Sequence, residues 1–79
     1  MPTVLRTGPY RLYYYSHEPN EAAHVLVDRD NLSAKFWLDP ISLARNFGFG
    51  PAELRRIERI LRENEFILLE AWYEKFGDA

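Results

Sequence analysis

Arginine, tyrosine and histidine side chains near the start of the sequence have the types and spacing for acid–base chemistry. Arg11, Tyr13 and Tyr15 alternate along a strand-like run, and alternation places side chains on one face of a sheet. His24 falls in the next strand-like run. On a shared face, His24 or a tyrosine would remove the proton of an RNA 2′-hydroxyl while Arg11 held the charge that builds on the phosphate. One hypothesis is therefore a metal-independent ribonuclease; the other is that His24 is a stacked or hydrogen-bonded residue of the sheet.

Metal and cofactor chemistry are not favoured by the sequence. There is no cysteine, so a thiolate metal site is excluded. His17, Glu18, His24 and Asp28 do not have the tight spacing of a ligand set. No glycine-rich phosphate loop and no nucleophile elbow is present in the sequence. We expect no bound metal and no cofactor.

Charge is distributed unevenly along the last third of the sequence. Arginines crowd its first half and acidic residues crowd its second half. One interpretation is a solvated face with pairs such as Glu58 and Arg62 at helical spacing. The other is a nucleic-acid surface, although the net charge of −2 argues mildly against it. The candidates for nucleic-acid binding are Arg55, Arg56, Arg59 and Arg62.

One long helix and a small sheet are the elements that would position these side chains. Apolar residues three and four apart run from 51 to 76 and place an apolar stripe on one face of a helix. Pro51 suits the first helical position, and Gly77 suits the residue that closes a helix. Such a helix would span about 39 Å, whereas strands of five or six residues span about 17–20 Å. The helix should therefore overhang the sheet, unless it breaks near Asn64.

Before the helix, runs rich in β-branched and aromatic residues alternate with turn residues and predict an antiparallel sheet. The segment 41–46 is undecided, because Ile41 and Leu43 alternate like a strand whereas Leu43, Ala44 and Phe47 fit a helical turn. The expected architecture is a single α+β domain, residues 1–79, with four to five strands at about 3–6, 10–15, 23–29, 34–38 and the undecided 41–46, packed on one helix at about 51–76.

Apolar and aromatic side chains are more abundant than the outer surfaces of this fold should need. The sheet face turned away from the helix is expected to carry Tyr13, Leu26 and Trp37, and a sheet face open to water should be more polar. The overhanging part of the helix would expose further apolar side chains, unless it bends at Asn64 onto its own core. Exposed apolar surface of that size usually marks an interface. We expect a homodimer or a small partner protein, bound by Trp37, Phe66, Leu69, Trp72 and Phe76.

The sequence has no run that is apolar and long enough for a signal peptide or a membrane span. Because there is also no cysteine, we expect a cytoplasmic protein that does not associate with membranes.

The sequence resembles a known family from Met1 to Gly77. The resemblance rests on the opening Met-Pro-Thr-Val-Leu-Arg-x-Gly-Pro-Tyr-Arg-x-Tyr-x-Tyr-Ser, on His-Val-x-Val at 24–27 and on Ala-Lys-Phe-Trp-Leu-Asp-Pro at 34–40. These motifs are similar to those of short uncharacterised bacterial and archaeal proteins, grouped as a domain of unknown function. The resemblance implies a gene beside that of a second small domain, an arrangement similar to toxin–antitoxin pairs. Where the family pattern reads Pro-Pro-His-Val-His-Val, this chain has Leu26 in place of the second histidine.

The function that we expect is a small cytoplasmic protein-interaction module, one component of a toxin–antitoxin-like pair as the resemblance implies. One alternative is the ribonuclease toxin that uses His24 with Arg11 and Tyr13 or Tyr15. The second alternative is a nucleic-acid-binding regulator that uses the four helix arginines. From the sequence alone, whether the chain is an enzyme stays open.

Overall fold

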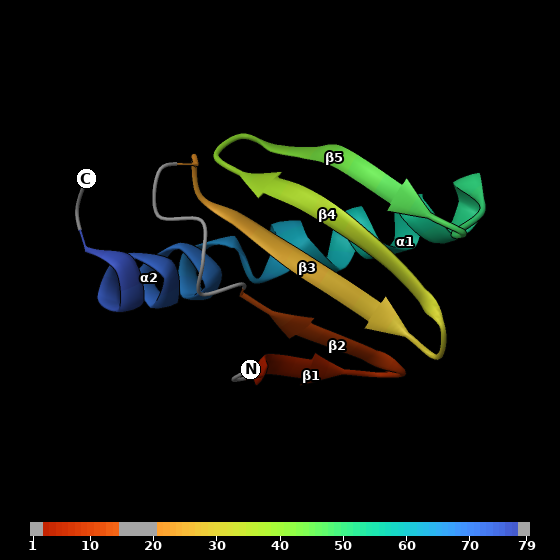
Figure 1. Ribbon diagram of the computed structural model, residues 1–79, viewed down its shortest axis with the longest axis horizontal. Coiled ribbons are helices and arrows are strands. Elements are labelled where there is room, and N and C mark those ends of the chain that lie inside the picture. Colours follow the sequence, from red (N-terminus) through yellow and green to blue (C-terminus); the bar gives the residue numbers. More distant parts are fainter. Residues whose placement is uncertain (1–2, 15–20, 78–79) are drawn as a thin grey trace.

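The structure, a computed structural model, describes residues 3–14 and 21–77 of the chain. Five antiparallel strands form one open sheet in the order β1-β2-β3-β4-β5, and α1 crosses behind it while α2 continues past its end (Figure 1). This confirms the α+β fold and assigns segment 41–46 to a strand. Tyr15 and His17 lie outside the described residues. The elements are β1 Thr3–Thr7, β2 Tyr10–Tyr13, β3 His24–Arg29, β4 Leu32–Leu38, β5 Ile41–Phe47, α1 Pro51–Glu63 and α2 Glu65–Phe76.

Two-residue turns join the strands of three hairpins. Between β1 and β2, Gly8 has a φ of 58°, which a glycine adopts without steric cost. Between β3 and β4, Asp30 has a φ of 56°, and Asp is one of the residues that tolerate this conformation. Between β4 and β5, the Asp39–Pro40 peptide bond is cis. Pro40 is the second residue of this turn.

The core lies between the sheet and the helices, on the face that strand alternation predicts. Because side chains alternate along a strand, every second residue of β2, β3 and β4 points to the helices. Burying such a side chain contributes about 1.5–3 kcal/mol. The most buried members of the core are Leu12, Tyr14, Val25, Val27, Ala34, Phe36 and Leu38 from the sheet and its end, with Ile57, Leu61 and Leu68 from the helices.

The predicted single helix is interrupted at Asn64, between α1 and α2. Asn64 has φ −118° and ψ 15°, outside the helical region. Its side-chain Nδ2 donates a hydrogen bond to the Ile60 carbonyl oxygen at 2.8 Å. An asparagine side chain that bonds nearby backbone competes with the regular helical ladder, which accounts for the break. Although α2 continues past the end of the sheet, its Leu68 and Trp72 side chains are buried in the core.

Candidate interaction surfaces

His24, the predicted general base, begins β3 and is fully buried. Its Nδ1 lies 2.9 Å from the Ala22 carbonyl oxygen. A carbonyl oxygen only accepts, so Nδ1 carries the proton. Nε2 has no hydrogen-bond partner among the residues that the structure describes. The ring packs against Trp37 and Trp72, with centroids 5.9 and 4.9 Å away. The structure thus places His24 as a stacked, hydrogen-bonded sheet residue.

Arg11 and Tyr13 lie together on the sheet face turned away from the helices. The Arg11 guanidinium carbon is 4.6 Å from the centre of the Tyr13 ring, within cation–π distance. Tyr13 donates its hydroxyl to Asp28 Oδ1 at 3.1 Å. Because Tyr13 pairs with Leu26, His24 lies on the same face, two residues along β3. Of the predicted ribonuclease residues that the structure describes, Arg11 and Tyr13 are adjacent, whereas Arg11 pairs with Asp28, four residues along β3 from His24, and the imidazole itself is out of reach of solvent.

Trp37, predicted to bind a partner, lies on the same outer face and is partly buried. Lys35 places its Nζ 4.9 Å from the centre of the Trp37 ring, and His24 packs against the ring at nearly a right angle. Lys35 also donates to Glu21 Oε1 at 2.5 Å. Trp37 thus belongs to a network of contacts within the chain.

A polar cluster that sequence reasoning missed joins the first turn of α1 to the sheet. Arg29 donates from Nε and Nη2 to the two carboxylate oxygens of Glu53, at 2.5 and 2.9 Å. Tyr10 donates its hydroxyl to the same carboxylate at 2.8 Å. The hydrogen bond from Arg29 lowers the pKa of Glu53, although desolvation opposes this effect. No local spacing indicates a pair that is 24 residues apart, and its role is to hold α1 on the sheet.

One side of α2 packs into the core through residues that the sequence predicted for a partner. Trp72 is 5% exposed, and its ring centroid lies 5.4 Å from that of Tyr14 and 4.3 Å from that of Phe76. Leu69 and Phe76 are partly buried against the same core. Tyr14 donates its hydroxyl to the Leu68 carbonyl oxygen, and burial raises the pKa of its phenol. The exposure on which the prediction rested is therefore not found for Trp72.

The opposite side of α2 carries exposed apolar surface. Phe66, the remaining predicted contact, is 77% exposed, and Ile67 and Tyr73 are 52% and 42% exposed. Residues seven apart return to the same side of a helix, so Tyr73 lies on the side of Phe66. We call Phe66, Ile67 and Tyr73 the outer strip. The sequence did not identify Ile67 and Tyr73 as exposed apolar residues. The helical position of Ile67 also fits the edge of the apolar stripe that faces the core, and Tyr73 falls outside that stripe.

The four arginines predicted for nucleic-acid binding are all exposed on α1, which leads directly into the outer strip. Arg62 Nη2 lies 3.8 Å from Glu58 Oε1, one helical turn away. Exposed pairs of this kind contribute about 0.3–0.5 kcal/mol. The guanidinium groups of Arg55, Arg56, Arg59 and Arg62 therefore form a basic surface beside an apolar one.

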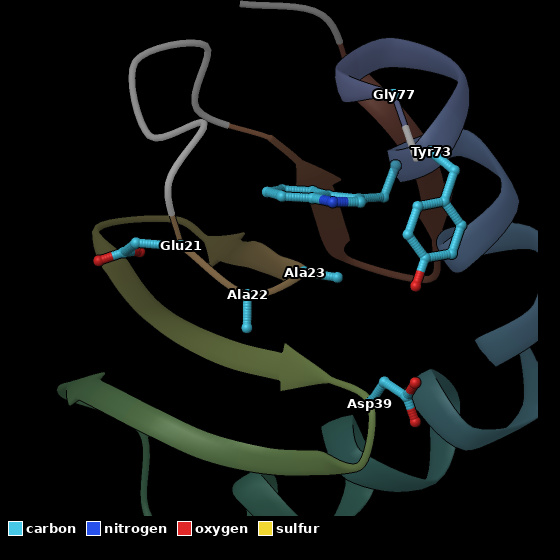
Figure 2. A pocket seen from close by; sticks show the side chains of 7 residues that line it. Glu21, Ala22, Ala23, Asp39, Tyr73 and Gly77 are labelled. Carbon is cyan, nitrogen blue, oxygen red and sulfur yellow. The ribbon is translucent and has the colours of Figure 1, made fainter. Parts of the chain in front are cut away.

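An open hollow of about 220 Å³ lies where the start of β3, the β4–β5 turn and the end of α2 meet (Figure 2). Asp39 brings a carboxylate to it, and the Tyr73 hydroxyl points toward Asp39, whereas the Glu21 side chain points away from both. Glu21 already accepts the bond from Lys35. The rest of the hollow is lined by Ala22, Ala23, Trp72 and Gly77.

Within residues 3–14 and 21–77, no three His, Asp or Glu side chains lie close enough to hold a metal ion. No helix in these ranges combines the length and the apolar character needed to cross a membrane.

The comparisons with known proteins give one match. A family model described as a domain of unknown function (DUF4160) matches residues 10–73, which is most of the chain and takes in β2 to β5, α1 and most of α2. The searches of curated proteins and of solved structures give no match.

Proposed function

We propose that this chain, which belongs to the DUF4160 family, is a protein-interaction module that binds through the exposed side of α1 and α2. The observation that carries the proposal is Phe66, a large aromatic side chain left 77% exposed opposite the core. Burying a phenylalanine contributes about 1.5–3 kcal/mol. A partner that covers the outer strip would gain that free energy, together with contributions from Ile67 and Tyr73.

The charge beside the outer strip defines the chemistry of the partner. The exposed arginines of α1 precede Phe66, and aromatic and arginine side chains are the residues that most often dominate binding energy. Complementary charge speeds association and fixes register. We therefore expect a protein surface that has an apolar patch flanked by carboxylates.

The proposal includes the setting that the resemblance implies: a cytoplasmic bacterial or archaeal protein that works with the product of a neighbouring gene, as in toxin–antitoxin pairs. The sequence motifs that resemble the family suggest this source and the neighbouring gene, and a sequence free of cysteine supports the cytoplasmic location. The ribonuclease alternative gains no support from the geometry, because the His24 side chain is fully buried.

Nucleic-acid binding by α1 is the second candidate function, because all four arginines are exposed on one helix. A regulator of this type should bind any duplex with an affinity that falls steeply as salt rises. Fluorescence anisotropy of a labelled duplex tests this. Absence of binding at low ionic strength would remove the candidate.

The experiment that tests the interaction module is co-expression of the tagged chain with its neighbouring genes, with the mass of the purified product measured by light scattering. The proposal expects a complex of defined stoichiometry that is larger than the 9.4 kDa chain. Phe66→Ser should dissociate this complex. The matched control is Phe47→Ser, which removes a phenylalanine that is 57% exposed on the edge strand β5 and should leave the complex intact. A complex that survives Phe66→Ser, or a wild-type chain that purifies alone as a monomer, contradicts the proposal.

A further inference from the structure

The exposed side of α1 and α2 has an oppositely charged pair, an arginine and a glutamate, placed symmetrically about Phe66. Arg62 precedes Phe66 by four residues, and Glu70 follows it by four. Arg59 precedes Phe66 by seven residues, and Tyr73 follows it by seven. Steps of four and seven residues return to nearly the same side of a helix. One exposed side therefore reads arginine, arginine, phenylalanine, glutamate, tyrosine.

The interruption at Asn64 does not break this alignment. The Asn64 N–H donates to the Ile60 carbonyl oxygen at 3.2 Å, and the Leu68 N–H donates to the Asn64 carbonyl oxygen at 2.9 Å. Both bonds span four residues, as in an α-helix, although the Asn64 N–H is shared with the Leu61 carbonyl oxygen at 3.1 Å. The burial of the side chains agrees with this alignment. Leu61 and Leu68, before and after Asn64, are both buried on the core side, and Arg62 and Phe66 are both exposed on the outer side.

We infer that the partner of this surface is a second copy of the chain, with the two α1–α2 segments antiparallel about a two-fold axis at Phe66. The inference rests on the proposed function and names its partner. In this pairing each residue meets the one equally far beyond Phe66 on the other copy. Arg62 meets Glu70 as an ion pair, and Arg59 meets the Tyr73 ring in a cation–π contact. Each pair forms twice, as an isologous interface requires.

Charge complementarity selects a second copy in this orientation. A parallel pairing would set the arginines of α1 against each other and the glutamates of α2 against each other, and like charges that face one another suppress association. The antiparallel pairing places the basic α1 of one copy along the acidic α2 of the other. The apolar patch flanked by carboxylates, which the proposed function expects of the partner, is thus present in the chain itself.

Charge reversal tests the pairing, because the symmetry makes a specific prediction. Arg62→Glu alone places two glutamates opposite each other twice in the dimer, and Glu70→Arg alone places two arginines opposite each other twice. Each variant should dimerise about tenfold or more weakly than the wild type. An equimolar mixture of the two variants restores both ion pairs and should recover dimers. The measurement is sedimentation-velocity ultracentrifugation over a range of concentrations at low salt.

Two controls separate pairing from folding and from overall charge. Arg45→Glu changes the net charge as Arg62→Glu does, but Arg45 is exposed on the edge strand β5 and not on the α1–α2 surface; it should leave the dimer unchanged. Far-UV circular dichroism shows that each variant is folded. If Arg62→Glu fails to fold, Arg62→Gln replaces it and should weaken the dimer less than a reversal does.

The outcomes distinguish this inference from the proposed function. A wild-type chain that is monomeric alone but forms a Phe66-dependent complex with a neighbouring gene product overturns the second copy and leaves the interaction module standing. Single variants that dimerise as tightly as the wild type, or a mixture that stays monomeric, overturn the antiparallel pairing. A chain that forms neither complex overturns both.

Discussion

Replacing Trp72 with alanine distinguishes a core residue from a partner contact. The Trp72 side chain is 5% exposed and lies against Tyr14, His24 and Phe76. Truncating a buried tryptophan to alanine costs about 3–5 kcal/mol. At about 0.05–0.15 kcal/mol per residue, a chain of this length has a total stability of about 4–12 kcal/mol. Trp72→Ala should therefore remove a large part of the free energy of unfolding.

The assay is urea unfolding followed by circular dichroism at a helical wavelength, with the free energy of unfolding extrapolated to water. Trp72→Phe keeps an aromatic ring and should cost less than the alanine. Phe66→Ala is the matched control: it truncates an exposed aromatic side chain on the same helix and, at a protein concentration low enough for the chain to be monomeric, should change stability by less than about 0.5 kcal/mol. If Trp72→Ala were as stable as Phe66→Ala, Trp72 would not belong to the core and the packing of α2 described here would be wrong.

Three further changes test the contacts that hold the elements together. Tyr14→Phe removes the hydroxyl that bonds the backbone of α2 and should lower the free energy of unfolding by about 1 kcal/mol, measured in urea. The pKa of Glu53 is lowered beside Arg29. Its ionised form therefore stabilises the fold above the unfolded pKa of about 4.3, and this contribution is lost as pH falls through the folded pKa. Between about pH 6 and pH 3, the melting temperature of the wild type should fall more than that of Glu53→Gln, and equal falls would contradict the ion pair of Glu53 with Arg29. Gly48 has a φ of 111°, and an added Cβ would lie 2.5 Å from Leu32 Cδ2. Gly48→Ala should therefore lower the free energy of unfolding by at least about 1 kcal/mol in the same assay. An unchanged free energy of unfolding would contradict this backbone conformation of Gly48.

The sheet was predictable because its signals are local. Alternation along each run separates the outer residues Leu26 and Trp37 from the buried Val25 and Phe36, since a strand side chain points to one of only two faces. Turn residues such as Gly8 located the hairpins. The helical periodicity located α1 and α2, and the sequence also indicated Asn64 as the place where a break was conceivable.

The candidate surface was less predictable because it depends on contacts between distant segments. Helix length alone placed Trp72 beyond the sheet, but Tyr14 reaches past the end of β2 and bonds the backbone of α2. The buried side of α2 is therefore decided by a residue 54 positions away. The same holds for the pair of Arg29 and Glu53. His24 shows the converse problem, because its spacing suits catalysis while its neighbours bury it.

Hydroxyl-radical footprinting of the assembled complex, compared with the dissociated chain, tests the central claim most directly. The method reports how much solvent reaches individual phenylalanine and tyrosine side chains. If the module binds through the outer strip, oxidation of Phe66 and Tyr73 should fall in the complex while oxidation of Phe47 stays unchanged. Unchanged oxidation of Phe66 together with protection of Phe47 or Trp37 would place the interface on the sheet and contradict the account.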